Sequence, residues 1–401
     1  MRKTAVFNVN EVFVISFSFA ILFSVITGFV VYGYLTSSSA KNNSNVDDIV
    51  STYNKVINNY YEDIDKEGLK DAAISGMMDF LDEKYSVVLD STSSNSLYDK
   101  LDGYYKGIGI EIKKNADNKF EIINVLKNSP AKTAGLKVDD IIETINGVVL
   151  QSDFTNNDIL SMFDKSEKVK FEIRRGNKIL LFEIKIGNIY IPVTKTKVYK
   201  SNKYAIGYIK LSNFSSSSYE QFKDSLEDVE KEKIDSLIID LRSNTGGYLN
   251  SADKIASLFL KKDKRIYALK NKEKLEYYVD KTEEHRNYPI VVLVNKNTAS
   301  ASEILTFALK ESYGAFVIGN KTYGKGKVQQ FNTLSNMTTI KYTTALWYSP
   351  NGNSCDEVGI EPGITVNLKA LSSGKYNYDS DSQVEKSIEF LINYINSKKN
   401  Y

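Results

Sequence analysis

Residues 289–311, PIVVLVNKNTASASEILTFALKE, join an apolar run to a helix-forming stretch through a short polar turn. Ile290 to Val294 have the length and composition of one buried strand. After Thr298 the apolar residues return at helical spacing. A strand that turns directly into a helix is the repeating unit of α/β proteins, so this segment predicts an α/β domain around it.

Strands and helices alternate on both sides of this segment. We expect strands at Tyr204–Leu211, Ser236–Leu241 and Ile290–Val294, and helices at Ser217–Lys231, Leu249–Leu260 and Ser302–Ser312. This alternation predicts an α/β domain of mixed sheets and helices over residues 188–370. A last helix near Ser382–Ser397 predicts a C-terminal helical region over residues 371–401.

Residues 101–187 read as a small β domain, because short strands follow one another between turns. Ser129-Pro130-Ala131 opens a short helix that ends near Gly135. Ile141–Ile145 alternates as a strand, and Asn146-Gly147 then favours a tight hairpin turn. The strands Lys168–Arg174 and Lys178–Ile186 flank a second turn.

Residues 36–100 predict a linker followed by helices. The pattern is helical from Val46 to about Leu89, with a second helix at Asp71–Leu81. These helices are thinly apolar, so we expect them to pack on the α/β domain or on a second copy of the chain. The second arrangement would make a homodimer.

The N-terminus predicts a membrane anchor. Residues 12–35 are mostly Val, Ile, Phe and Leu, carry no charge, and are long enough to span a bilayer. Arg2 and Lys3 favour a cytoplasmic location for residues 1–11, which places the rest of the chain outside the cytoplasm of a bacterial cell. The alternative is a long signal peptide that is cut near Ser37–Ala40.

Composition excludes several functions. The 401 residues include 52 basic and 50 acidic side chains, a formal net charge of +2, so nothing indicates nucleic-acid binding. The one cysteine, Cys355, cannot form an internal disulfide, and no Cys/His cluster has metal-ligand spacing. We expect neither a metal nor an organic cofactor. Only one histidine, His285, is present, which excludes most mechanisms that use a histidine base.

Ser300 is a candidate nucleophile, because it lies where the strand turns into the helix. The first N–H groups of a helix have no intrahelical partner and can stabilise the oxyanion of a tetrahedral intermediate. Ser300 and Glu303 also have the S-x-x-E spacing of a capping box, so Ser300 can equally be an N-cap without a catalytic role.

Lys325, within Tyr323-Gly324-Lys325-Gly326-Lys327-Val328-Gln329, is a candidate base. A serine hydroxyl needs a base, and a lysine can serve if burial lowers its pKa from about 10.4 toward 7. If this segment is a strand, Gln329 projects on the same face as Lys325 and can orient the amine. The alternative is a surface loop with solvated lysines.

Residues 240–247, Asp-Leu-Arg-Ser-Asn-Thr-Gly-Gly, follow a predicted strand and precede a predicted helix. Glycines in such a turn can expose backbone N–H groups to an oxyanion. The turn lacks the Gly-x-Gly-x-x-Gly and Walker patterns, so a nucleotide site is weakly supported.

Together and in this order, these motifs resemble those of the carboxyl-terminal processing peptidases, also called tail-specific proteases. The resemblance runs from about Asn54 to Val366. Residues 298–303 resemble the nucleophile signature of that family, and residues 323–327 resemble its lysine signature, with Lys325 lying 25 residues after Ser300. The resemblance implies a membrane-anchored serine endopeptidase with Ser300 as nucleophile, Lys325 as general base and Gln329 as a supporting residue. It also implies an oxyanion hole made by Gly246 or Gly247 and the backbone of Ala301.

Residues 101–187 then resemble the PDZ domain of that family. The resemblance implies that Gly107-Ile108-Gly109-Ile110 hold the C-terminal carboxylate of a protein or peptide substrate with an apolar tail. Arg175 resembles an arginine that couples this domain to the catalytic site in some relatives, although Arg174 is adjacent and either can be a solvated hairpin residue. The alternative is an unspecialised β domain.

The predicted architecture is thus an α/β multidomain chain with a transmembrane helix, a small helical region, a PDZ-like domain and a peptidase domain. Two functions other than proteolysis stay open. One is a catalytically inactive, membrane-tethered PDZ scaffold, and the other is a tethered solute-binding protein.

Overall fold

The computed structural model describes residues 27, 44–163, 167–201, 203–334, 338–367 and 381–399. The chain divides into two compact units, residues 1–83 and residues 84–401. Apart from Thr27, the predicted membrane span at residues 12–35 lies outside the described residues. None of the helices among the described residues combines the length and apolarity that a membrane span requires.

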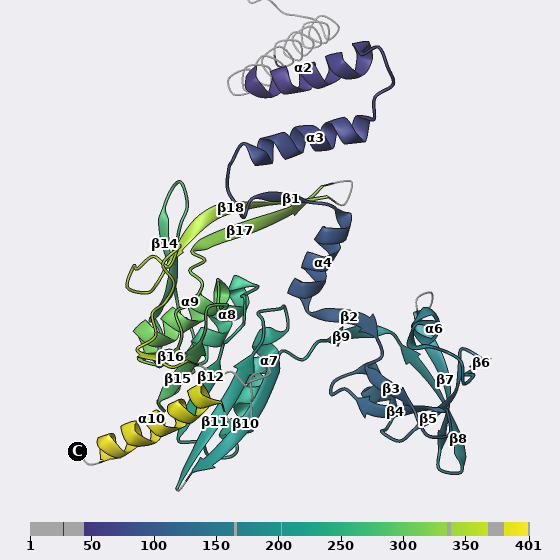
Figure 1. Cartoon of the computed structure of the whole chain (residues 1–401), viewed down its shortest axis with the longest axis vertical. Coiled ribbons are helices and arrows are strands. Elements are labelled where there is room, and N and C mark those ends of the chain that lie inside the picture. The colour runs from purple at the N-terminus through teal and green to yellow at the C-terminus, as the bar shows by residue number, and fades with distance from the viewer. Residues whose placement is uncertain are drawn as a thin grey trace, which may run out of the picture. The chain divides into compact units, whose positions relative to one another are not determined.

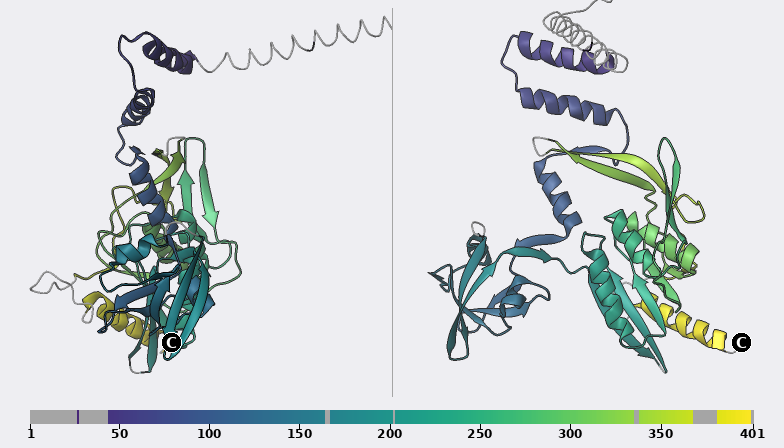
Figure 2. Two further views of the ribbon diagram at one scale, coloured as in Figure 1. Left: turned by 90° about the vertical axis from the view of Figure 1, so that its right-hand side faces the viewer. Right: turned by 180° about the vertical axis from the view of Figure 1, so that it is seen from behind.

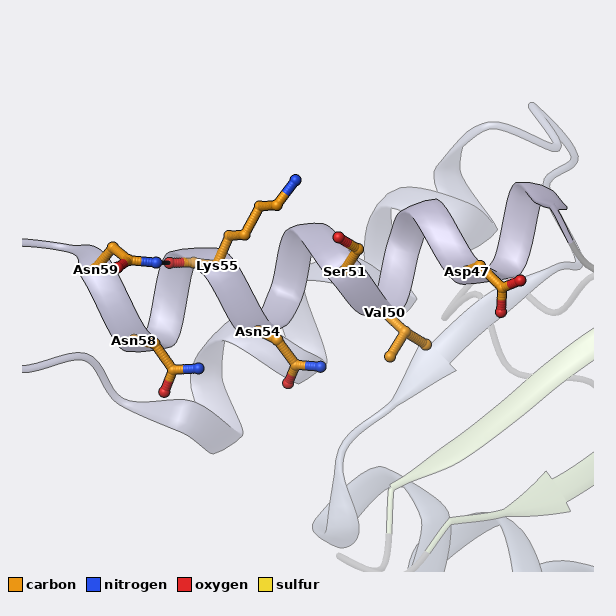
Figure 3. A pocket seen from close by; sticks show the side chains of 7 residues that line it. All are labelled: Asp47, Val50, Ser51, Asn54, Lys55, Asn58 and Asn59. Atoms are coloured by element: carbon orange, nitrogen blue, oxygen red, sulfur yellow. Dashed lines mark hydrogen bonds between the residues drawn. The ribbon is translucent and has the colours of Figure 1, made fainter.

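The first unit contains two helices, α2 (Ser44–Asn59) and α3 (Lys66–Asp79). Asp65 caps α3, because its carboxylate accepts a hydrogen bond from the Glu67 N–H. Both helices expose apolar side chains, among them Ile49, Val50 and Met77, and Phe80, directly after α3, is also exposed. A shallow pocket on α2 is lined by that helix alone and is mostly polar, with Val50 as its apolar member (Figure 3).

The helical pattern that was expected to continue to about Leu89 ends at Asp79. Val87–Leu89 forms a strand, β1, which pairs with a strand some 250 residues further along the chain. This pairing overrides the local pattern, as tertiary context commonly does for short apolar segments.

The α/β domain of the second unit is built on a six-stranded sheet in the order β10-β11-β12-β15-β16-β19 (Figure 1). β10 is antiparallel to β11, and the other neighbours are parallel. The strands are β10 (Thr194–Ser201), β11 (Tyr204–Leu211), β12 (Ser236–Asp240), β15 (Ile290–Val294), β16 (Phe316–Gly319) and β19 (Ile364–Thr365). The central strands β12 and β15 are buried along their whole length, which explains their unbroken apolar sequences.

Helices cover both faces of this sheet. One face packs against α7 (Ser218–Glu230), α8 (Leu249–Ser257) and α9 (Ala301–Phe307), the last continued by a π-helix at Ala308–Tyr313. The opposite face packs against α10 (Ser382–Lys399), shown in yellow in Figures 1 and 2. Because β11, β12, β15, β16 and β19 are parallel, their carboxyl ends lie at the same edge of the sheet. Ligands bind at this edge in open α/β sheets.

A second sheet carries the edge strand β17 (Lys327–Thr333). Its other members are β1, β13 (Arg265–Lys270), β14 (Leu275–Val279) and β18 (Thr339–Tyr348). β18 pairs with β17 on one side and with β1 and β13 on the other.

The PDZ-like region follows α4 (Ser91–Asp102) and lies between the two strands of a short antiparallel ribbon, β2 (Tyr104–Gly107) before it and β9 (Gly187–Tyr190) after it. Its sheet runs in the order β3-β4-β5-β7-β8, with β6 beside β5. The elements are β3 (Ile110–Lys114), β4 (Phe120–Val125), α5 (Pro130–Ala134), β5 (Ile141–Ile145), β6 (Val148–Val149), α6 (Asn156–Ser161), β7 (Lys168–Arg175) and β8 (Lys178–Lys185). Asn146 and Gly147 both have positive φ, as the predicted hairpin turn requires.

Candidate active site

Ser300 lies at the start of α9, directly after the turn that follows β15. Its backbone has φ 58° and ψ −121°, a conformation that residues with a side chain rarely adopt. Such strain costs roughly 1–3 kcal/mol and persists only where the surroundings impose it. It is typical of sharp strand-to-helix turns that present a nucleophile.

The carboxylate of Glu303 binds the backbone of Ser300 in this conformation. Glu303 is fully buried in the first turn of α9, and its Oε2 accepts a hydrogen bond from the Ser300 N–H at 2.9 Å. This contact is the Glu303 half of the predicted capping box. Ser300 therefore does occupy the N-cap position, but with a positive φ where an N-cap residue usually has an extended backbone.

Glu303 also binds the segment that carries Lys325. Its Oε2 accepts the Lys325 N–H at 2.9 Å, and its Oε1 accepts the Gly324 N–H at 2.7 Å and the Thr322 hydroxyl. One carboxylate thus joins the backbone of Ser300 to that of Lys325. Hydrogen bonds to an ionised acceptor are about twice as strong as neutral ones, so this clamp fixes the two segments relative to each other.

The lysine segment, residues 322–326, is an irregular stretch of backbone held against residues 355–359. Gly324 has φ 87°, and the Gly326 N–H donates to Asp356 Oδ1 at 3.0 Å. A Cβ on Gly326 would lie 2.5 Å from the Cβ of Asp356, so only glycine fits there. Trp347 Nε1 donates to the Lys325 carbonyl at 2.8 Å from the other side.

The strand expected to place Lys325 and Gln329 on one face begins only at Lys327. A register shift between Val328 and Gln329 further breaks the alternation, and Gln329 Nε2 lies 3.4 Å from Thr343 Oγ1. Residues 324–326 lie outside the strand, and Gly324 has φ 87°, which is incompatible with an extended strand.

Residues 240–247 lie next to Ser300, at the carboxyl end of β12. The carbonyl of Asn244 accepts the Ala299 N–H at 3.1 Å and the Ser302 hydroxyl at 2.9 Å. A Cβ on Gly246 would lie 2.9 Å from that of Ser300, so glycine permits this close approach.

The two glycines of this loop differ in their hydrogen bonds. The Gly246 N–H donates to Asn244 Oδ1 at 2.9 Å. The Gly247 N–H, by contrast, has no acceptor among the described residues. Only the second N–H can therefore reach an oxyanion without breaking a bond within the loop.

These segments meet in a groove of about 690 Å³. Of the predicted site residues, it brings together Ser300, Ala301, Lys325, Gln329, Gly246 and Gly247. Its walls also include apolar side chains from several elements, among them Leu97, Leu101, Phe214, Ile304, Val328 and Trp347. A larger cavity, of about 1000 Å³, lies beside α7, so size does not single out this groove. The groove is singled out by the strained Ser300 and by Lys325, which both line it.

Sequence reasoning assigned no role to three residues near Lys325. Glu303 was noticed only as a capping partner, and Trp347 and Tyr85 carry no local signal. The Lys325 Nζ lies 5.0 Å from the centroid of the Tyr85 ring, within the range of a cation–π contact. Tyr85 lies 240 residues before Lys325, so no motif could have linked them.

Cys355 is fully buried. Burial, with the nearby Glu303 carboxylate, raises the pKa of its thiol far above the ordinary range. The thiol is therefore protonated and unreactive at neutral pH.

In the PDZ-like region, Gly107-Ile108-Gly109-Ile110 join β2 to the edge strand β3. Ile108 is 2% exposed within the domain core, and Ile110 packs against that core. Arg175 lies outside the groove: its guanidinium donates to both carboxylate oxygens of Asp140, at 2.6 and 2.7 Å, and to the Gly135 carbonyl. Arg174 binds Glu143.

Comparison with known proteins gives three family matches. The model of peptidase family S41 matches residues 205–366, a PDZ domain model matches residues 107–186, and the model of the activating protease CtpB N-terminal domain matches residues 33–93.

Individual proteins match most of the chain. Carboxy-terminal processing protease CtpB of Bacillus subtilis is 37% identical over 80% of this chain and 68% of its own length. Carboxy-terminal processing protease CtpA of the same organism is 32% identical, over 82% and 71%. Among solved structures, the photosystem II D1 C-terminal processing protease is 19% identical, with a TM-score of 0.46 over 81% of this chain and 94% of its own.

Proposed function

The chain belongs to peptidase family S41, among the carboxy-terminal processing proteases that carry a PDZ domain, and on this basis we propose that Ser300 and Lys325 form its catalytic dyad. The observation that carries the proposal is the Glu303 clamp. It binds the backbone of a strained serine and of a lysine that line one groove.

The dyad would work as follows. The neutral Lys325 amine accepts the Ser300 hydroxyl proton while Oγ attacks the carbonyl carbon of a substrate peptide bond. The Gly247 and Ala301 N–H groups stabilise the oxyanion. The proton then passes from Lys325 to the leaving amine as the C–N bond breaks. A water molecule, deprotonated by Lys325, hydrolyses the acyl ester and restores Ser300. Gln329 lines the groove as a supporting residue.

Cleavage of a denatured protein with an apolar C-terminal tail tests the dyad. With the full chain in detergent micelles, Ser300→Ala and Lys325→Ala should abolish cleavage while the protein stays folded. Ser397→Ala and Lys386→Ala are matched controls on the exposed side of α10 and should cleave like the wild type. Cleavage by Ser300→Ala would refute the nucleophile. A wild type that cleaves none of several such substrates would instead favour an inactive scaffold.

We further assign tail recognition to the edge strand β3 and the glycines that precede it. β3 pairs with β4 on one side only, so a peptide can add to its other edge by main-chain hydrogen bonds. Substrates that end in apolar residues should be cleaved faster than the same proteins ending in aspartate. Equal rates for both tails would exclude this selectivity.

Finally, we assign residues 12–35 to a single membrane span, with the catalytic domain on the extracytoplasmic side. The uncharged apolar length of that segment supports the span, and Arg2 and Lys3 support its direction. The apolar side chains exposed on α2 and α3 support pairing of two chains. Sedimentation equilibrium of the chain in detergent would show whether it is a dimer.

A further inference from the structure

The C-terminal helix α10 lies beyond residues 205–366, which the peptidase family model covers, yet it is part of the catalytic domain. Its apolar side chains Val384, Leu391 and Ile395 cover one face of the central sheet. Its first residues lie near the carboxyl ends of β12 and β16. The glycine loop (residues 240–247) and the segment that leads to Lys325 (residues 320–326) begin there, and we call these two segments the catalytic loops.

Arg242 links this helix to the loop of residues 240–247. Its Nη1 donates to Asp381 Oδ1 and to Gln383 Oε1, both at 2.9 Å. Its Nε and Nη2 donate to the carboxylate of Asp240, at 2.9 and 2.6 Å. All four residues are buried, and Arg242 lies two residues after Asp240, the last residue of β12. The guanidinium therefore joins the start of the glycine loop to the start of α10.

Gln383 links the same helix to the segment that carries Lys325. Its side chain is fully buried, and its Nε2 donates to Asn320 Oδ1 at 3.2 Å and to the Val366 carbonyl at 2.6 Å. Asn320 follows β16 directly and begins the stretch that leads to Lys325. One side chain thus contacts the first residues of both catalytic loops, through Arg242 and through Asn320.

The charges make this network costly to open. Two carboxylates, Asp240 and Asp381, face one guanidinium in a site closed to water. Although burial alone would lower the pKa of Arg242, the hydrogen bonds and charges of the two carboxylates raise it above its usual value. Asp381 also caps α10, because its Oδ1 accepts the N–H groups of Gln383 and Val384. Removing one member would leave buried polar groups without partners.

We propose that Asp381 and Gln383 are positioning residues, through which the C-terminal helix holds the glycine loop and the lysine segment in register. The inference rests on the dyad proposed above, because it concerns the relative placement of Gly247 and Lys325. Neither residue lines the groove, so neither contacts the substrate. Their loss should reduce transition-state stabilisation and leave substrate binding almost unchanged.

Gln383→Leu tests the inference, since leucine has a similar size but can neither accept from Arg242 nor donate to Asn320. We expect kcat to fall about 10-fold or more, because small misplacements of catalytic groups are costly, while KM stays within about threefold. Amide hydrogen exchange should accelerate in residues 241–248 and 320–326. If Gln383→Leu does not fold, Asp381→Asn replaces it in the test. Asparagine keeps the capping oxygen but removes the charge, so kcat and hydrogen exchange should change in the same direction by a smaller amount.

The matched control is Asn396→Leu, which removes a polar contact between the same helix and Tyr204 at its far end. It should keep kcat within twofold of the wild type and leave exchange in both loops unchanged. The inference is wrong if Gln383→Leu or Asp381→Asn leaves exchange in both loops at the wild-type rate, or if Asn396→Leu lowers kcat as much. A wild type without cleavage would refute the dyad, whereas hydrogen exchange would still test the role of α10.

Discussion

The N–H of Ser300, a residue with a strained backbone, is bound by a buried carboxylate that also binds the N–H of Lys325. N-cap residues usually have an extended backbone, so the positive φ of Ser300 is a departure from an ordinary helix cap. Glu303 is thus the residue through which the local turn and the distant lysine become one site.

We predict that Glu303→Gln lowers kcat/KM about 10- to 100-fold and lowers the free energy of unfolding by about 2–4 kcal/mol. The glutamine NH₂ would face N–H groups that need an acceptor, so at least one of the four hydrogen bonds would be lost. Steady-state kinetics and urea unfolding measure the two effects. The control is Glu311→Gln, whose carboxylate accepts from Asn351 and Asn353 at the surface, and it should change stability by less than about 0.5 kcal/mol. Wild-type kinetics in Glu303→Gln would contradict the clamp.

Asp253, on α8, has the opposite effect on stability. Burial and the neighbouring Asp280 carboxylate raise the pKa of Asp253 from 3.8 to about 6. Between these values the folded protein keeps a proton that the unfolded chain releases, so stability falls as pH rises through this window. We predict that Asp253→Asn raises the free energy of unfolding at pH 7.5 by about 1–3 kcal/mol and that this gain shrinks toward pH 4.5.

Thermal unfolding at a series of pH values between 4.5 and 7.5 checks this expectation. Asp228→Asn is the control, because the hydrogen bond from Lys231 lowers the pKa of Asp228, so its loss should not stabilise the protein at pH 7.5. A gain for Asp253→Asn that stays constant across this pH range would show that the charge of Asp253 is not the cause.

The sequence alone identified Ser300 and Lys325 as candidates, because each lies in a motif with a local chemical meaning. It did not identify the partners that hold them. Trp347 contacts the Lys325 carbonyl from 22 residues away, and Tyr85 reaches the same lysine from 240 residues away. Such contacts depend on how strands pair, and no short pattern records them.

The segment that carries Lys325 is held in place by a second segment of irregular backbone. Residues 322–326 and residues 355–359 pack backbone against backbone: Gly324 accepts the Glu357 N–H, and Thr322 donates its N–H to Ile360. The space between them leaves no room for a side chain at Gly326. A rigid, closely packed segment can hold an amine more accurately than a mobile loop.

We therefore predict that Gly326→Ala lowers kcat at least about 10-fold and destabilises the protein by about 1–3 kcal/mol, because the new Cβ would push the segment away from Asp356. Kinetics and thermal unfolding measure both. Gly76→Ala is the control: its Cβ would meet no atom within 4 Å, and alanine favours the helix α3. It should leave kcat unchanged. Unchanged kcat in Gly326→Ala would show that the segment tolerates displacement.

Periodicity predicted the regular elements of the α/β domain well and the irregular ones poorly. β11 and β15 span the expected residues, and α7 differs from its expected bounds by one residue at each end. The helix predicted at Ser302–Ser312 begins as α9, but it ends in a π-helix, a change that hydrophobic spacing does not reveal.

The chain as a whole combines an apolar N-terminal segment with a large folded unit. If residues 12–35 span the membrane, the full chain should sediment with membranes and resist extraction by carbonate, and a fragment of residues 36–401 should stay in the supernatant. Western blotting of both fractions measures this. A full chain that is found in the supernatant at its full mass would exclude the anchor, whereas one that has lost its first 36–40 residues would indicate a cleaved signal peptide.

The order of domains could be predicted from changes in hydrophobic spacing and turn residues along the sequence. These patterns change from helical, to short strands between turns, to alternating strands and helices. Two long-range connections could not be predicted. Val87–Leu89 joins a sheet formed mainly by residues 265–348, and α10 supplies Asp381 and Gln383 to the network around Arg242. Both link a terminal part of the chain to the catalytic domain, and neither has a local signature.

The pairing of Val87 with Lys341 also sets an order of events during synthesis. A ribosome adds about 5–20 residues per second, so β1 waits roughly 12–50 seconds before its partner strand has been translated. Until then, the sheet that contains β17 and borders the groove is incomplete. Gln383 is translated later still. The groove that holds Ser300 and Lys325 therefore stays incomplete until Trp347, which also lines it, has been translated, and a nascent chain cannot attack neighbouring polypeptides before that point.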